Sequence, residues 1–353
     1  MSDLSNNFSK VCAHTEWDPL EEVVIGRITG GVFPDWHDTM AVTMPETSWS
    51  LFKEQGGLSF PPEQIKAAEK ELDTFSEILS AEGIKVVRPD ALSHSKSFST
   101  PNWQSKGGLY AAMPRDSLLV VGDIIIEAPM AWRCRYHETE AFRKLIKHYF
   151  QNGARWLPAP KPQLTDDLYN QEITENSYAV TEFEPVFDAA DFLRFGSDIV
   201  VQRSHVTNEF GIKWLERTVG PEYQIHCIEV NDPYAMHIDA TIMPLAPGRL
   251  LVNPERFVPQ PLFEDWEIIV APQPALPKDW PMYFSSHWLS MNIISLDEKT
   301  VVVEAQEKPL IDLLTRRGFK CIPVNFRHFY SFGGSFHCAT LDIRRNGVRR
   351  NYL

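Results

Sequence analysis

The chain has 353 residues, 43% hydrophobic and 23% charged, so it can bury a large core without disulfides or a structural metal. Its formal net charge of −13 and its lack of basic stripes argue against binding to nucleic acid. No apolar run approaches the ~20 residues that span a membrane, and the start resembles neither a secretion signal nor a transit peptide. With five scattered cysteines, the composition predicts a cytoplasmic protein.

Amphipathic segments recur along the chain, and most end at a glycine that leads into a short β-rich run. In the first of them, Ile65, Leu72 and Leu79 follow helical spacing. Four such segments are predicted as helices, at residues 61–83, 138–153, 208–220 and 307–318. A fifth unit at residues 259–272 is shorter and lacks the glycine.

Strand–turn–strand patterns lie between these segments. The first turns at Gly122–Asp123 between two β-branched runs, which is a hairpin signal. The same pattern is found at residues 117–129, 192–204, 241–255 and 291–305. A fifth hairpin would have to pair the two ends of the chain, residues 20–27 with residues 336–345.

The sequence therefore contains about five units, each with a hairpin, a helix and a further strand. A repeat of this kind favours a closed architecture in one domain over residues 1–353, because pairing the two ends removes exposed strand edges. A doubly wound parallel sheet is the alternative, and it fits less well because every unit requires an antiparallel pair.

Cys338 lies in "SFGGSFHCAT", residues 331–340, and has three interpretations: a nucleophile, a metal ligand or a buried filler. Free cysteine is among the most buried residue types, which favours the filler. The double glycine before it would let a substrate approach the thiol closely. A thiol becomes nucleophilic when a nearby imidazolium lowers its pKa.

A histidine for that role is found in "AMHIDATIMPL". His237 and Asp239 are two residues apart, so on a strand both would point to one face. The alternative is a hydrogen-bonded core histidine beside a turn aspartate. His337 is the sequence neighbour of Cys338, but on a strand it faces away from it, so we expect His337 to point outward and His237 to be the partner.

Two further aspartates precede predicted hairpins. Asp188 in "FEPVFDAADF" could orient a histidine or simply cap a short helix. Asp116 in "MPRDS" also reads well as a turn residue. In a ring of repeats, equivalent hairpin ends converge near the axis, so these residues would meet Cys338 and His237 there.

With these residues assembled, the chain closely resembles the arginine:glycine amidinotransferase family almost from end to end. The resemblance rests on "TEWDPLEEVVIGR", "GLYAAMPRD", "IIEAPMAWR", "APKPQLTDDLYNQ", "TEFEPVFDAADF", "MHIDAT", "NPER", "SSHWLSMN" and "GGSFHCAT". It implies an α/β fold, the five-bladed pentein propeller of ββαβ modules with pseudo-fivefold symmetry.

The resemblance also implies residue roles. Cys338 becomes the nucleophile, His237 the general acid and base, and Asp188 the residue that orients His237. The substrate-binding residues would be Asp116 and Asp239 on the guanidinium, Arg256, Ser285 and Ser286 on the amino-acid head group, and Met236.

The implied reaction moves the amidino group of L-arginine to an acceptor amine through an amidino-cysteine and releases ornithine. The resemblance implies a homodimer, and we expect no cofactor and no metal. A zinc site formed by His337, Cys338 and His237 would lack any paired-ligand spacing. A hydrolase on the same fold, an arginine deiminase or a dimethylarginine hydrolase, is the alternative function.

Three positions depart from the glycine-accepting members of the family: Tyr234, Ser335 and Phe332. The glycine motif is closer to relatives in bacterial natural-product pathways, including cyanobacterial toxin pathways. These three residues are therefore predicted to shape acceptor selectivity, and an amine other than glycine is the expected acceptor.

Overall fold

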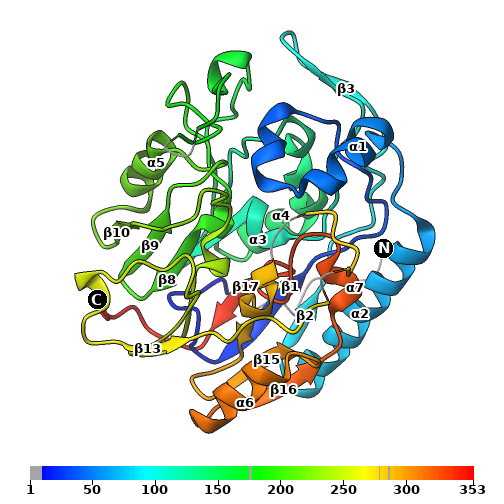
Figure 1. Cartoon of the computed structure of the whole chain (residues 1–353). Coiled ribbons are helices and arrows are strands. Elements are labelled where there is room, and N and C mark those ends of the chain that lie inside the picture. The colour runs from blue at the N-terminus through cyan, green and yellow to red at the C-terminus, as the bar shows by residue number, and fades with distance from the viewer. Residues whose placement is uncertain (1–9, 175–176, 278, 285–286) are drawn as a thin grey trace.

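The computed structural model describes residues 10–174, 177–277, 279–284 and 287–353. Within these residues, five three-stranded sheets form the body of the molecule (Figure 1). The first sheet joins the two ends of the chain and contains β17 (Thr340–Arg345), β1 (Leu20–Ile25) and β2 (Lys85–Val87).

The other four sheets follow in chain order. They are β5 (Leu118–Val121), β6 (Ile124–Glu127) and β7 (Arg155–Pro158); β8 (Phe192–Phe195), β9 (Asp198–Gln202) and β10 (Gln224–Ile228); β11 (Ile242–Ala246), β12 (Arg249–Val252) and β13 (Glu267–Val270); and β14 (Ile294–Ser295), β15 (Thr300–Glu304) and β16 (Lys320–Val324).

Each sheet has the same pairing, an antiparallel pair with a third strand added in parallel. In the second sheet Val121 pairs with Ile124 across the turn, and β7 lies parallel to β6. Gly122 has a φ of 57°, the left-handed conformation that a tight hairpin turn needs. The five predicted hairpins are confirmed, including the one between β1 and β17.

Helices connect the second and third strands in most sheets. They are α2 (Pro62–Ala81), α4 (Arg143–Gln151), α5 (Glu209–Val219) and α6 (Lys308–Arg316). The connection before β13, where every residue is described, holds only the 3-10 turn η7 (Pro261–Phe263), as the shorter fifth unit suggested. The helix predicted at residues 138–153 is wrong in its first part, which is the 3-10 helix η3 (Glu138–Phe142). Glu138 there is buried against Arg135 instead of starting an exposed helix.

Hydrogen bonds between neighbouring sheets run around the ring and close it. Thr241 Oγ1 donates to Gln202 Oε1, which joins the fourth sheet to the third, and Ser295 Oγ donates to the Leu245 carbonyl, which joins the fifth to the fourth. Leu20 N donates to the Leu296 carbonyl, and this bond joins the first sheet to the residues that follow β14 in the fifth. The predicted α/β propeller with five blades is confirmed.

An ionic network of buried side chains lies next to β1 and β17, the strands near the middle of Figure 1. Glu16 contacts Arg194 and Arg115, and Asp342 contacts both arginines and Arg345. All five side chains are buried. We call these five residues the central network. Each carboxylate of the network contacts arginines and each arginine contacts a carboxylate, so no charge is buried without a partner.

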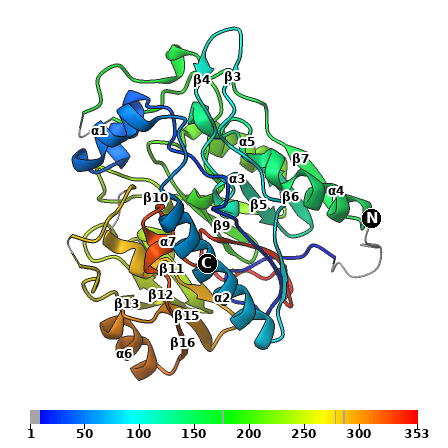
Figure 2. The same ribbon diagram turned by 90° about the vertical axis from the view of Figure 1, so that its right-hand side faces the viewer.

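Besides several 3-10 helices, the structure contains helices and a hairpin that were not predicted, and one of them, α3 (Pro114–Ser117), is buried where the blades converge. The others are α1 (Glu46–Gln55), the hairpin of β3 (Phe98–Ser99) and β4 (Gln104–Ser105), and α7 (Arg327–Tyr330). Helix α7 packs against α2 (Figure 2). Among the described residues, no helix is both long and apolar enough to cross a bilayer.

Candidate active site

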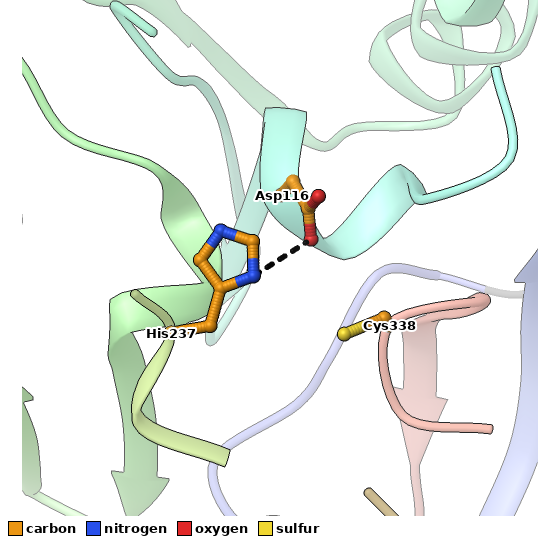
Figure 3. A group of neighbouring side chains, drawn as sticks. All are labelled: Asp116, His237 and Cys338. Atoms are coloured by element: carbon orange, nitrogen blue, oxygen red, sulfur yellow. Dashed lines mark ion pairs between the residues drawn. The ribbon is translucent and has the colours of Figure 1, made fainter. Parts of the chain in front are cut away.

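A narrow cavity of about 50 Å³ lies where the blades converge. The described residues that line it are Thr43, Tyr110, Asp116, Trp132, Arg135, Met236, His237, Asp239, Ala240, Phe284, Leu289, Asn292, Gly333 and Cys338. Figure 3 shows three of them, Asp116, His237 and Cys338, coming from three separate segments and facing one point. The expected convergence of hairpin ends is confirmed.

The repeat explains this convergence, because each blade contributes residues that directly precede its hairpin. The pairs of residue and following strand are Cys338 and β17, Asp116 and β5, Asp188 and β8, His237 with Asp239 and β11, and Asn292 and β14.

Cys338 is buried and lies two residues before β17. The close packing around it depends on the glycine pair that precedes it. Gly333 has a φ of 91°, and a side chain there would meet Phe284 at 2.7 Å. A side chain at Gly334 would come within 2.8 Å of Cys338 Cβ. The two glycines therefore let Phe284 and Met113 pack closely beside the thiol, and that they also let a substrate approach it remains a prediction.

Asn292 fixes the thiol, and the sequence analysis missed it. Its Nδ2 donates to Cys338 Sγ at 3.0 Å, and its Oδ1 accepts from the backbone N–H of Cys338 and of Ser335. The signal was available in the repeat, because Asn292 precedes β14 as the other site residues precede their own strands.

His237 does not lie on a strand, so that part of the prediction is wrong. It precedes the 3-10 turn η6 (Ile238–Ala240) with a φ of 65°, a strained conformation for a residue with a side chain. The strain is consistent with a functional position, and it places the ring between two carboxylates. Nε2 lies 3.0 Å from Asp188 Oδ2, and Nδ1 lies 3.8 Å from Asp116 Oδ1 (Figure 3).

Asp188 stands at the N-cap position of η5 (Ala189–Asp191), but its side chain makes no capping hydrogen bond. Its carboxylate contacts His237 instead. Arg135 Nη1 donates to both Asp188 and Asp116, at 3.3 and 3.0 Å. Arg135 is a second residue that the sequence analysis missed, and it links the two aspartates under the cavity.

One carboxylate oxygen of Asp116 has no hydrogen-bond partner among the described residues. Oδ2 accepts from Arg135, whereas Oδ1 is buried and has no hydrogen-bond partner among the described residues. Asp239 lies opposite, and its Oδ2 accepts from Cys338 Sγ at 3.3 Å. A planar cation entering between the two aspartates would satisfy the open oxygen.

His337 does not point outward, so that prediction is wrong. Its side chain is 1% exposed, with Nδ1 2.8 Å from Asp239 Oδ2 and Nε2 3.3 Å from Glu16 Oε2. The prediction failed because residues 336–339 form turns before β17, and the alternation of a strand does not apply to them.

Burial and the neighbouring charges shift the pKa values of the titratable groups in the cavity. Burial and the nearby Asp239 raise the pKa of the Cys338 thiol to about 12. Burial alone would lower the pKa of His237, but Asp116 and Asp188 raise it well above its usual value. Burial raises the pKa of Asp116, although His237 and Arg135 oppose the shift. The site therefore favours a neutral thiol beside a charged imidazole until another cation arrives.

The remaining predicted residues are spread more widely. Met236 lines the cavity, whereas Arg256 forms an ion pair with Asp232 and is not among the described lining residues. Ser285 and Ser286 lie outside the described residues. Of the predicted selectivity residues, Tyr234 is 62% exposed, whereas Ser335 and Phe332 are fully buried. None of the three is among the described residues that line the cavity. They could therefore act on the cavity only through their neighbours.

The ligand atoms of Asp116, His237 and Cys338 lie within 4.8 Å of one another. Zinc accepts such a mixture of oxygen, nitrogen and sulfur. This set differs from the one considered in the sequence, because His337 contacts two carboxylates instead. That no metal is needed remains a prediction.

Known proteins with similar sequences share nearly the whole chain. An L-arginine:L-lysine amidinotransferase of Pseudomonas savastanoi pv. phaseolicola is 51% identical over 352 residues, which are 98% of this chain and 97% of that protein. The mitochondrial glycine amidinotransferase of Gallus gallus is 46% identical over 358 residues, 97% of this chain and 85% of its own. The chain belongs to the amidinotransferase family. No protein-family model matches it.

Solved structures agree with this family assignment. An amidinotransferase from Microseira wollei in the saxitoxin biosynthetic pathway is 47% identical with a TM-score of 0.92, over 98% of this chain and all of that one. The inosamine-phosphate amidinotransferase of Streptomyces griseus is 38% identical with a TM-score of 0.89, over 98% and 99% of the two chains. A dimethylarginine dimethylaminohydrolase, 14% identical with a TM-score of 0.59 over 91% and 99%, shares the pentein fold alone. The predictions of family, fold and transferase class are confirmed.

Proposed function

We propose that this amidinotransferase moves the amidino group of L-arginine to a primary amine through a covalent intermediate on Cys338. The observation that carries the proposal is that the Cys338 thiol, the His237 ring and a carboxylate oxygen of Asp116 lie within 4.8 Å of one another, and that Asp116 Oδ1 is buried without a hydrogen-bond partner among the described residues. The name of the Pseudomonas relative supports arginine as the donor.

The donor's guanidinium would lie between Asp116 and Asp239. Charge-assisted hydrogen bonds to two carboxylates would fix its plane, with its carbon facing Cys338 Sγ. Because Sγ already contacts Asp239 Oδ2, a cation bound to that carboxylate lies beside the thiol. Arg256, Ser285 and Ser286 remain the residues proposed for the donor's carboxylate and amino group, and Met236 would pack against its side chain.

Binding of the donor would also activate the thiol. Burial and the carboxylates raise the pKa of Cys338 in the empty site. A guanidinium neutralises those carboxylates, so the thiol loses its proton most readily when the reacting carbon is already in place. This arrangement protects the nucleophile from other reagents between turnovers.

The first half-reaction forms the sulfur–carbon bond and breaks the bond between the amidino carbon and the ε-nitrogen of the donor, which becomes the δ-amine of ornithine. The thiol proton is released to solvent as the guanidinium binds, and the protonated His237 gives its own proton to the departing nitrogen, which leaves the ring neutral for the second half-reaction. Ornithine leaves, and a cationic amidino-cysteine remains. Asp188, hydrogen-bonded to Nε2, would orient the ring throughout.

In the second half-reaction the acceptor amine attacks the amidino carbon. His237 takes its proton, the sulfur–carbon bond breaks, and Cys338 is protonated again. The relatives use lysine, glycine or inosamine phosphate according to their names, so the acceptor is proposed only as a primary amine. The likeness to the saxitoxin-pathway protein supports a role in natural-product biosynthesis.

Incubation with arginine alone tests the proposal. We expect a burst of ornithine of one equivalent per active site, followed by further turnover only when an amine is added. The Cys338→Ala variant serves as the control and gives no burst. Continuous formation of citrulline and ammonia without an amine would contradict the transferase and indicate a hydrolase.

A further inference from the structure

His337 connects the central network to the catalytic cavity, although it does not line that cavity. Its Nδ1 lies 2.8 Å from Asp239 Oδ2, and its Nε2 lies 3.3 Å from Glu16 Oε2. Both partners are carboxylates, which only accept hydrogen bonds. An imidazole N–H can donate to either carboxylate, and the contact from Nδ1 to Asp239 is the shorter of the two.

The backbone of His337 is held as firmly as its ring. The carbonyl accepts from Arg115 Nε at 2.8 Å and from Thr340 Oγ1 at 3.0 Å, and the N–H donates to the Asn292 carbonyl at 3.3 Å. The backbone bonds fix the point from which the ring extends, and the contact of Nε2 with Glu16 fixes its direction. Asp239 is thus held in the place that the ring defines.

We propose that His337 is a positioning residue, whose hydrogen bond to Asp239 holds that carboxylate in place for the guanidinium of the donor. The inference rests on the proposed role of Asp239 in donor binding. It concerns a residue that acts through Asp239 and has no contact of its own with the reacting atoms.

The charges around His337 show which carboxylate needs it. Glu16 also contacts Arg115 and Arg194, so it stays paired without the histidine. Asp342 on β17 is paired with the same arginines and adds no free charge next to the ring.

Asp239 depends on His337 more strongly. Its other neighbours are the Cys338 thiol, the cation of His237 and the carboxylate of Asp116 across the cavity. Burial would raise the pKa of Asp239, and the hydrogen bond from His337 is the main influence that lowers it. Without that bond the carboxyl group is protonated more readily, and a neutral carboxyl group holds a guanidinium poorly.

Two substitutions separate the two bonds of the ring. His337→Asn places an amide near Nδ1 and keeps a donor for Asp239, whereas His337→Gln reaches the position of Nε2 and keeps the donor for Glu16. His226→Asn is the matched control, because His226 forms a similar pair with Asp198 on β9 and is not among the described cavity residues.

The measurement is the ornithine burst in rapid-quench experiments, as a function of pH and arginine concentration. We expect His337→Gln to raise the apparent dissociation constant for arginine by ~10-fold or more and to move the acidic limb of the pH profile upward by about one pH unit. His337→Asn should show a clearly smaller change in both, and His226→Asn should show none. Equal effects of the Asn and Gln variants, or a native pH profile in His337→Gln, would overturn the proposal.

A double-mutant cycle keeps the test independent of folding defects. If His337 acts through Asp239, the Asp239→Asn variant loses donor affinity, and adding His337→Gln to it weakens binding no further. Additive losses would overturn the positioning role and leave the proposed function intact. Native arginine affinity in Asp239→Asn would refute the proposed role of Asp239, and the inference on His337 with it.

Discussion

Two buried ionic regions lie side by side in this amidinotransferase, and His337 joins them. In the central network Glu16 and Asp342 are surrounded by Arg115, Arg194 and Arg345, and their pKa values are lowered although burial alone would raise them. In the cavity the pKa of Asp116 is raised and one of its oxygens is open. Glu16 and Asp342 are thus paired with cations within the fold, whereas Asp116 keeps an oxygen that the proposed cationic donor would bind.

The largest expected effect is a loss of kcat on substitution of Cys338. Cys338→Ala removes the proposed nucleophile, so kcat should fall by ~10⁵-fold or more. The free energy of unfolding should fall by only ~1–3 kcal/mol, because Asn292 Nδ2 and Asp239 Oδ2 each lose one hydrogen bond to Cys338 Sγ. Steady-state kinetics and thermal unfolding measure the two effects. Substantial residual transfer by this variant would show that another group accepts the amidino group.

The central network should show the opposite behaviour. Asp342→Asn leaves buried arginine charges without their partner and should lower the free energy of unfolding by ~3–5 kcal/mol. The remaining folded protein should keep its ornithine burst per active site. Urea unfolding and active-site titration check both statements, and a stable but inactive variant would contradict them.

The same network predicts a pH dependence of stability. The pKa values of Asp342 and Glu16 are lower in the folded state than in the unfolded chain. Their contribution is therefore complete above the unfolded value of about 4 and is lost as the pH falls through the folded values. Native stability should thus decline below about pH 4, and Asp342→Asn should flatten this decline. An unchanged acid slope in the variant would contradict the assignment.

Asp116 provides the matching test in the cavity. Asp116→Asn should reduce kcat/KM for arginine by ~10²–10³-fold, because a neutral amide replaces one of the two proposed guanidinium partners. Since its pKa is raised in the folded state, the ionised carboxyl group destabilises the fold at neutral pH. The variant should consequently be as stable as the native enzyme or more stable. Marked destabilisation would place Asp116 with the structural carboxylates.

The smallest expected effect concerns the acceptor. Tyr234 is exposed on the segment before His237, and its N–H bonds to Asp232, which also pairs with Arg256. Tyr234→Asn should change the relative kcat/KM of glycine and lysine as acceptors by ~10-fold or less. The ornithine burst with arginine should not change. An altered burst would assign Tyr234 to donor binding.

The sequence predicted the repeat well, because hairpins and amphipathic helices are local patterns. It also located Cys338, His237, Asp188, Asp116 and Asp239 before their strands, which the structure brings together. The assignment of roles came from the family resemblance.

What the sequence could not predict depends on turns and on long-range pairing. The backbone of His237 adopts a positive φ, and His337 turns inward toward Glu16, a partner more than 300 residues away. Asn292 could have been found from its place before a predicted hairpin, whereas nothing in the sequence shows that Arg135 contacts the two aspartates.

The most direct test of the account is mass spectrometry of the enzyme quenched after reaction with arginine in the absence of an amine. The account predicts that the peptide containing Cys338 gains the mass of one amidino group, and that this mass is lost when a primary amine is added. Asp342→Asn should form the same adduct, and Cys338→Ala should form none. An amidino group found on another residue, or ornithine release without any covalent adduct, would contradict the central claim.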